Sequence, residues 1–154
     1  MNAYKKLALM TLVSTVVMFF LMYLNTYQLD HIFFSETRLY MAFIMGAVMV
    51  MIMLSFMPGM YKNCRLNIGI YVGSIFIFAV SLWLVRSQET IDDRSWMKAM
   101  IPHHSIAILT SSRANISDPR VRKLADGIIE TQKREIEEMK ILLNDVDKEQ
   151  KEKH

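Results

Sequence analysis

The sequence predicts an all-α membrane protein, in which three transmembrane helices are followed by an amphipathic αα-hairpin outside the cytoplasm. The first half of the chain contains three long apolar runs free of Lys, Arg, Asp and Glu. Only five glycines and three prolines occur in 154 residues, which favours long helices over strands and turns. The second half carries apolar residues at helical spacing. We therefore expect a membrane domain over residues 1–85 and a hairpin domain over residues 86–154.

Each apolar run is long enough to cross a bilayer as a helix. The runs cover residues 7–27, 39–57 and 66–85, and a transmembrane helix needs roughly 20 apolar residues. A cleavable signal peptide is the competing interpretation of the first run, because Lys5 and Lys6 precede it. However, the run is longer than a usual signal core, and the LNTYQLD segment at its end lacks an A-x-A-like cleavage site. We expect the first run to be retained as a membrane helix.

The basic residues of the short flanking segments predict the orientation in the cell membrane. Lys5 and Lys6 precede the first run, and Lys62 and Arg65 lie between the second and third runs. The loop between the first and second runs holds only Arg38. Because cytoplasmic flanks collect Lys and Arg, this distribution predicts a cytoplasmic N-terminus, with that loop and everything after the third run outside the cytoplasm.

The charge distribution argues against nucleic acid as a partner. Residues 1–85 carry five Lys and Arg against two Asp and Glu, whereas residues 86–154 carry thirteen of each. The basic excess therefore belongs to the membrane half, and a nucleic-acid-binding protein would need it on a soluble face. We expect the lipid bilayer, and no nucleic acid, as a partner. Cys64 is the only cysteine, so no disulfide forms within one chain.

The first hairpin helix is expected over about residues 91–112. Thr90 and Asp93 form a T-x-x-D capping-box pattern at its start. Pro102 lies inside the helical pattern. The helix is therefore expected either to kink at Pro102 or to begin a new segment there.

The second hairpin helix is expected over about residues 119–146. Asp118 followed by Pro119 is an N-cap with proline at the first helical position, and apolar residues then recur along one face. A hairpin of about 55 residues is too small for a secure core of its own. We therefore expect it to pair with a second copy as a four-helix bundle, or to lie against the spans.

The stretch WMKAMIPHH gathers ligand-type side chains on the first hairpin helix. At about 100° per residue, Met97 and Met100 lie within about 40° of His104, which places His104 in the middle of the apolar stripe. His103 lies about 100° away, at the edge of that stripe.

The second hairpin helix has a matching irregularity. Gln132 occupies the centre of its apolar face, with Met139 about 20° and Glu135 about 60° away. Burying an amide or a carboxylate without a partner costs on the order of 1–3 kcal/mol, so these groups need His104 or a metal ion as a partner. Imidazole and thioether ligands together suit a soft ion, and Cu(I) accepts both.

A bland interpretation of the same residues stays open. Methionines at helical spacing often fill cores, and a buried histidine is often only hydrogen-bonded. In that case His104, Gln132 and Glu135 form a network that fixes how hairpins pair. The sequence contains no Glu-x-x-His, no G-x-S-x-G and no Gly-rich phosphate loop, so we expect neither catalysis nor an organic cofactor. His31, beside Asp30 in the first loop, is expected to be solvated.

The second apolar run contains five methionines at intervals of four residues: Met41, Met45, Met49, Met53 and Met57. Each four-residue step drifts by about 40° around a helix, so these side chains do not line one straight path. We interpret them as ordinary apolar membrane residues rather than as an ion conduit.

The hairpin motifs resemble a known family. D-x-x-W-M-x-x-M-I-P-H-H-x-x-A-I at residues 93–108 and L-A-x-x-I-I-x-x-Q-x-x-E-I-x-x-M-x-x-L at residues 124–142 resemble the domain of unknown function three-hundred-and-five family, over about residues 90–145. The resemblance implies a ferritin-like helical fold, and some exported members bind copper through Met and His. It implies these copper ligands and supporting residues here: Met100, His103, His104 and Met139, with Gln132 and Glu135 in support. Met97, which shares the face of His104, is a further candidate metal ligand.

Two positions depart from the family pattern. Thr110 stands where copper-binding relatives commonly have a methionine in A-I-x-M, and Ser105 stands where Gln or Glu is frequent. Larger relatives also carry two hairpins, and this chain has one with three spans. The sequence thus predicts a membrane-anchored, extracytoplasmic metal-binding protein, most consistent with copper sequestration or resistance and assembled as a homo-oligomer through the hairpin. The alternative is a structural or partner-binding membrane module without metal.

Overall fold

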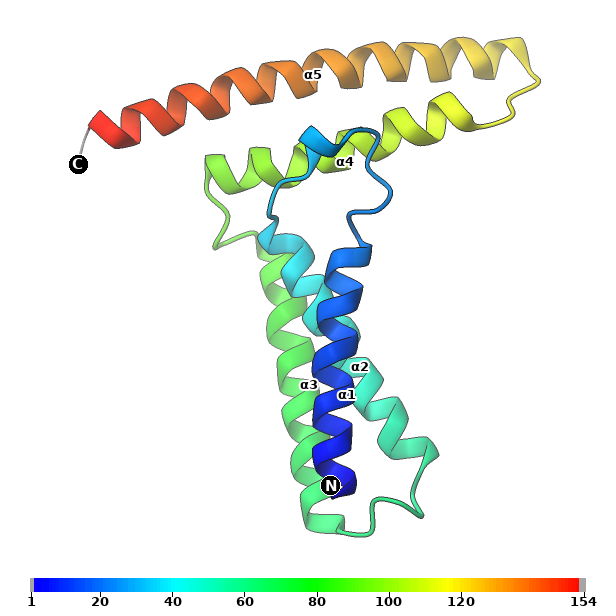
Figure 1. The fold of residues 1–154 in the computed structure, drawn as a ribbon, viewed down its shortest axis with the longest axis vertical. Helices are drawn as coiled ribbons and strands as arrows, with labels where there is room; N and C mark the ends of the chain where they lie inside the picture. The colour runs from blue at the N-terminus through cyan, green and yellow to red at the C-terminus, as the bar shows by residue number, and fades with distance from the viewer. Residues whose placement is uncertain (1, 153–154) are drawn as a thin grey trace. The chain divides into compact units, whose positions relative to one another are not determined.

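The predicted all-α class is confirmed. The computed structural model describes residues 2–152, and within this range it contains helices and no strand (Figure 1). The elements in chain order are α1 (Ala3–Leu21), the 3-10 helix η1 (Leu29–His31), α2 (Glu36–Phe56), α3 (Cys64–Ser87), α4 (Asp93–Arg113) and α5 (Pro119–Glu152).

The chain forms two compact units. The span unit contains the described residues through Met22 together with Thr37–Thr90. The hairpin unit contains the segment Tyr23–Glu36, which we call the first loop, together with the chain from Ile91 onward. The sequence-based division places the first loop with the spans. The structure groups it with the hairpin because its side chains and backbone bond to α4 and α5.

Three helices of the span unit are long and apolar enough to cross a membrane: α1, α2 and α3. Their bounds follow the three apolar runs except at the end of the first run, where the prediction of helix to residue 27 is wrong. α1 ends at Leu21, and Thr26 Oγ1 donates a hydrogen bond to the Tyr23 carbonyl oxygen at 3.1 Å in the turn that follows. Apolar composition continues beyond this turn, but the backbone has already left the helix.

A cluster of apolar side chains holds the span unit together near its N-terminus. Leu7 of α1 packs with Leu54 of α2 and with the buried Tyr61. Tyr4 Oη donates to Asn67 Oδ1 at 2.8 Å, which joins α1 to α3. Gly46 lets Thr15 of α1 approach α2, because a Cβ at Gly46 would collide with the threonine hydroxyl.

The methionines of the second apolar run do not share one environment. Met53 and Met57 pack against this apolar cluster, whereas Met41 is 46% exposed. This difference agrees with the drift expected for side chains spaced by four residues.

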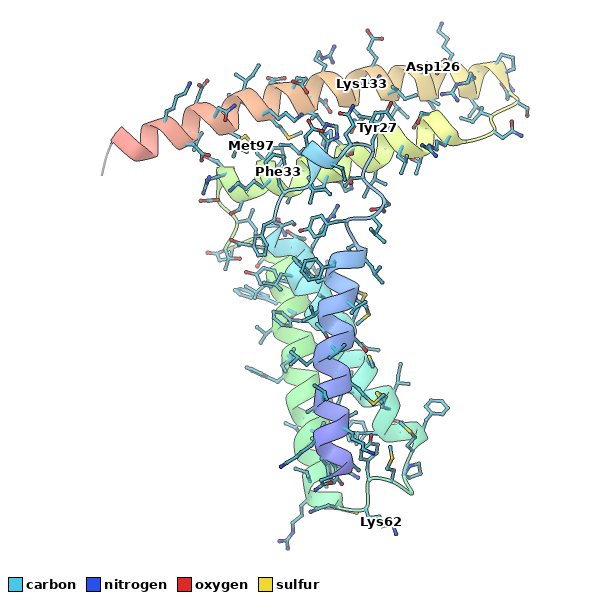
Figure 2. All side chains as sticks on the ribbon, viewed as in Figure 1. Tyr27, Phe33, Lys62, Met97, Asp126 and Lys133 are labelled. Atoms are coloured by element: carbon cyan, nitrogen blue, oxygen red, sulfur yellow. The ribbon has the colours of Figure 1, made fainter. Side chains whose placement is uncertain are left out.

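The two long helices of the hairpin unit, α4 and α5, lie antiparallel (Figure 1). Its buried core contains these apolar side chains: Met97, Ile101, Ile108, Ile136, Met139 and Leu143. Phe33 of the first loop packs against this core (Figure 2). Near the start of α4, Arg94 Nη2 donates to Asp147 Oδ2 at 3.2 Å and fastens the two helices together.

The ends of the hairpin helices differ in part from the sequence prediction. The N-cap of α4 is Asp92, whose side chain accepts from the Ser95 N–H at 2.7 Å, so the predicted box of Thr90 and Asp93 is wrong. α4 continues through Pro102 as one helix. The predicted start of α5 is confirmed, because Asp118 Oδ1 accepts from the Arg120 N–H at 2.8 Å.

Candidate metal-binding site on the hairpin

His104 connects the two predicted halves of the site. Its Nε2 atom lies 3.0 Å from Glu135 Oε2 on α5. Its Nδ1 atom lies 2.9 Å from the carbonyl oxygen of Met100, one turn earlier on α4. Gln132 Nε2 donates to the same Glu135 oxygen at 3.3 Å. The structure therefore brings together four of the predicted residues across the hairpin.

The Met100 carbonyl fixes how the His104 ring is protonated. A carbonyl oxygen only accepts hydrogen bonds, so Nδ1 must carry the proton in the contact at 2.9 Å. Nε2 is then the nitrogen that either carries a second proton toward Glu135 or offers a lone pair. A backbone carbonyl on one ring nitrogen is the usual way in which a metal-ligating histidine is oriented.

The predicted sulfur ligands lie at different depths. Met97 and Met139 are 6% and 7% exposed and belong to the apolar core. Met100 is half-buried and packs against that core. The chain thus uses Met97 and Met139 as packing residues in this structure, and Met100 is the methionine nearest the solvent.

His103 is exposed next to the half-buried His104. The two imidazole centroids are 6.1 Å apart, and their planes are inclined by 66°. Because consecutive residues on a helix point about 100° apart, His103 faces the flank of the hairpin rather than the α5 helix.

The buried centre of α4 is displaced from the predicted position. Ile101 and Ile108 are 0% and 1% exposed, whereas the side chain of His104 is 13% exposed, so it lies toward the edge of the buried face rather than in its middle. The displacement is toward Ser105, which has no exposed surface. The cause is the first loop, which covers that side of α4.

The first loop is anchored on Ser105. The Tyr27 N–H donates to Ser105 Oγ at 2.7 Å, and His31 Nδ1 lies 2.9 Å from the same oxygen. His31 is only 4% exposed, so the prediction of a solvated loop histidine is wrong. The small size of Ser105 matters as well as its hydrogen bonds. A Gln or Glu side chain at this fully buried position would collide with the first loop.

Two shifted pKa values accompany the anchoring of the loop. Burial lowers the pKa of His31, since a charged imidazole loses its hydration there. Lys140 Nζ donates to Asp30 Oδ2 at 2.7 Å and lowers the pKa of that carboxyl. The loop is therefore held on α4 through a neutral histidine and on α5 through an ion pair.

Ser105, His31 and Asp30 have the composition of a hydrolytic triad, but their arrangement is that of an anchor. His31 Nε2 lies 3.9 Å from Asp30 Oδ1, which is beyond hydrogen-bond distance. Ser105 is fully buried, and its hydroxyl oxygen already accepts from Tyr27. A substrate carbonyl therefore has no access to this oxygen.

The donor set of one hairpin fits a soft ion only in part. Among residues 2–152, no three His, Cys, Asp or Glu side chains lie close enough together to hold a metal ion. The accessible donors at the site are the imidazoles of His103 and His104 and the thioether of Met100. Two imidazoles and one thioether match the preferences of copper, especially Cu(I), better than those of hard ions.

The comparisons with known proteins identify one family and one relative. Residues 87–154 match the family described as Domain of unknown function (DUF305). An uncharacterized protein of Acanthamoeba polyphaga mimivirus is 32% identical over 143 residues, which cover 88% of this chain and 92% of that protein. The second match extends into the first half of the chain. No solved structure matches.

Proposed function

Because the chain belongs to the DUF305 family, we propose that it is a membrane protein whose hairpin binds a soft metal ion, copper in its Cu(I) state, outside the cytoplasm for sequestration or resistance. One observation carries this proposal. The Met100 carbonyl holds the Nδ1–H of His104, which leaves Nε2 as the nitrogen that can bind an ion.

The neighbours of His104 would supply further metal ligands and a carboxylate close to the bound ion. His103 and Met100 are the further ligands that an ion at this position would use. Glu135 lies 3.0 Å from Nε2 and would give up this contact when an ion takes the nitrogen. Because Gln132 also bonds Glu135, the displaced carboxylate keeps a partner and stays near the site. The bound ion would supply a positive charge beside that carboxylate.

The orientation predicted from the basic residues supports a role outside the cytoplasm. Lys5 and Lys6 lie in the first turn of α1, and Lys62 and Arg65 lie at the start of α3, so we infer a cytoplasmic N-terminus and a hairpin outside the cytoplasm. Three spans then anchor the site at the membrane, where it holds copper away from cytoplasmic proteins.

A structural role without metal is the second candidate. The contact of His104 with Glu135, and of Glu135 with Gln132, is the network that such a role requires. In this case the network fixes the pairing of α4 with α5, and replacing the histidines alters assembly rather than metal uptake.

A Cu(I) titration of the full chain in detergent, against a competing chelator, separates the two candidates. We expect His103→Ala with His104→Ala to weaken Cu(I) binding by about 10- to 100-fold or more, since direct ligands exceed supporting residues in their effect. His154→Ala is the matched control, because it removes a histidine at the end of the chain. Uptake equal in the double variant and the wild type would contradict the metal proposal and favour the network.

A further inference from the structure

A cavity lies among the three apolar helices of the span unit. It has a volume of about 440 Å³, and side chains of α1, α2 and α3 line it. The lining is apolar or small and contains no charged residue; Tyr4, Thr15, Gly73 and Ile77 belong to it. Pockets that bind small molecules usually have volumes of roughly 300–1,000 Å³, so this cavity is large enough for a ligand. We call it the span cavity.

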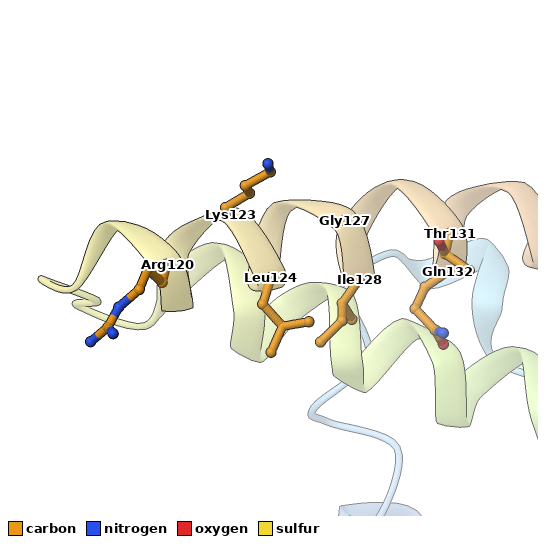
Figure 3. A pocket seen from close by; sticks show the side chains of 7 residues that line it. All are labelled: Arg120, Lys123, Leu124, Gly127, Ile128, Thr131 and Gln132. Atoms are coloured by element: carbon orange, nitrogen blue, oxygen red, sulfur yellow. The ribbon is translucent and has the colours of Figure 1, made fainter.

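The hollow along α5 is a different kind of surface. Figure 3 shows Arg120 and Lys123 toward one end of it, with Leu124 and Ile128 farther along the helix. This hollow is more open than the span cavity and combines charged with apolar side chains. The span cavity is the one of the two whose lining defines the chemistry of an occupant, which must be uncharged and apolar where it touches the helices.

Gly73 borders unfilled space in the span cavity. It is half-buried, and yet a Cβ placed on it would meet nothing within 4 Å. Gly46 also lines the cavity, but a Cβ there would collide with the Thr15 hydroxyl. α1 and α2 therefore approach closely at Gly46, while space remains beside Gly73. Packed proteins keep few voids larger than a water molecule, so we expect hydrocarbon to occupy this space between helices apolar enough to cross a membrane.

The span cavity has the depth of one membrane leaflet. Tyr4 and Thr15 are the first and last lining residues on α1, and they are separated by about 16 Å at a rise of about 1.5 Å per residue. One leaflet is about 15 Å deep, half of a hydrocarbon core of roughly 30 Å. Tyr4 Oη donates to Asn67 Oδ1 at 2.8 Å and accepts from the Asn63 N–H at 3.1 Å. The Tyr4 end is therefore polar, as the level of lipid headgroups requires.

Lys62 adds a positive charge at this polar end. It directly precedes Asn63, and it lies at the end of the span unit where α1 begins (Figure 2). Lys5 and Arg65, in the first turns of α1 and α3, have the same sign. The one carboxylate that the sequence places in the span unit is Glu89, which follows the opposite end of α3. The charge at the polar end therefore complements an anionic headgroup.

We propose that the span unit binds one anionic phospholipid from the leaflet on the side of the N-terminus, with an acyl chain in the span cavity and the phosphate beside Lys62. The lining accepts the chain, and each Lys or Arg near the membrane surface strengthens the binding of an anionic lipid by about fivefold. A neutral apolar molecule would fill the cavity without using this charge. The lipid site is independent of copper binding at the hairpin.

Native mass spectrometry of the delipidated full chain in detergent tests the site. The two probes are phosphatidylglycerol and phosphatidylcholine with identical acyl chains. We expect one bound phosphatidylglycerol per chain, held about fivefold or more tightly than phosphatidylcholine. Gly73→Leu puts a side chain into the cavity, and it should weaken binding of both lipids by about tenfold or more, since each displaced methylene lowers the affinity about fourfold.

The matched control for the cavity is Gly69→Leu. Gly69 lies one turn earlier on α3, a Cβ there also meets nothing within 4 Å, and it does not line the cavity. Binding should be unaltered in this variant. Unchanged binding in Gly73→Leu, or an equal loss in both variants, would overturn the lipid site, and circular dichroism checks that both proteins are folded.

A second pair of variants tests the headgroup without changing the packing of the helices. Lys62→Gln should lower the preference for phosphatidylglycerol about fivefold and leave phosphatidylcholine binding unaltered. Arg86→Gln, at an exposed cation in the last turn of α3, should leave the preference unaltered. Equal binding of the two lipids by the wild type, or an equal response to the two substitutions, would refute the anionic headgroup.

Discussion

The two flanks of the hairpin differ in how their apolar surface is covered. Each flank is the edge of a helix pair that cannot bury all of its apolar surface. The first loop covers one flank and is bonded there to Ser105 and Lys140. On this flank the loop histidine, His31, is buried. On the other flank, Trp96, Leu124 and His103 are exposed. The comparison teaches that the residues suited to copper lie on the flank that the chain itself leaves uncovered.

A larger side chain at Ser105 should have the largest effect on the covered flank, because it should detach the first loop from α4. In Ser105→Gln, the longer side chain enters a position with no exposed surface, and overpacking of this kind costs about 1–3 kcal/mol. We expect the loop to detach and hydrogen exchange of the Tyr27 amide to rise about tenfold or more. Exchange resolved to single amides by NMR measures this change.

The matched control for that substitution is Ser112→Gln, the same change at an exposed serine of α4. Exchange at Tyr27 should be unaltered in this variant. If Ser105→Gln leaves the Tyr27 amide as protected as in the wild type, then Ser105 does not hold the loop.

Acidification should loosen the covered flank by a smaller amount. Burial lowers the pKa of His31 in the docked loop, so the undocked loop binds the proton more tightly. Docking is therefore fully stable above the ordinary histidine pKa of about 6.5 and weakens as the pH falls below it. Asp30 and Glu137 oppose this trend and Lys140 reinforces it.

The test compares loop exchange at neutral and mildly acidic pH in the wild type and in His31→Gln. The wild type should lose protection on acidification, whereas the variant should show no such step between these pH values. A step of the same size in both proteins would assign the pH response to another group.

The architecture could be predicted from the sequence because its causes are local. The three helices that are long and apolar enough to cross a membrane follow from uninterrupted apolar composition, and the start of α5 follows from Asp118 and Pro119 alone. The start of α4 was misplaced because Thr90 and Asp92 both fit a capping pattern in the sequence, and only the backbone geometry selects Asp92.

The covered flank could not be predicted because its contacts join distant residues. Tyr27 and Ser105 are 78 positions apart, and Asp30 and Lys140 are 110 apart. The periodicity of apolar residues describes one helix at a time, and it predicted His104 at the centre of the buried face. His31 was expected to be solvated because it lies in a loop. The departure of Ser105 from the family pattern was the one available signal, since a small residue in place of Gln or Glu makes room for a neighbour.

The sequence predicted which residues make up the candidate site, but it did not predict how deeply each side chain is buried. The pairing of His104 with Glu135 follows from opposed irregularities on two amphipathic helices, and the structure brings them to 3.0 Å. Helical spacing alone did not separate the core methionines Met97 and Met139 from the more accessible Met100.

The most direct test of the proposed copper site is to follow the two ring nitrogens of His104 by ¹⁵N NMR while Cu(I) is added to the full chain. The Met100 carbonyl should keep Nδ1 protonated, so Nε2 alone should shift on binding, in step with His103. A shift of Nδ1 to a metal-bound value, or no change in either histidine at saturating Cu(I), would contradict the account.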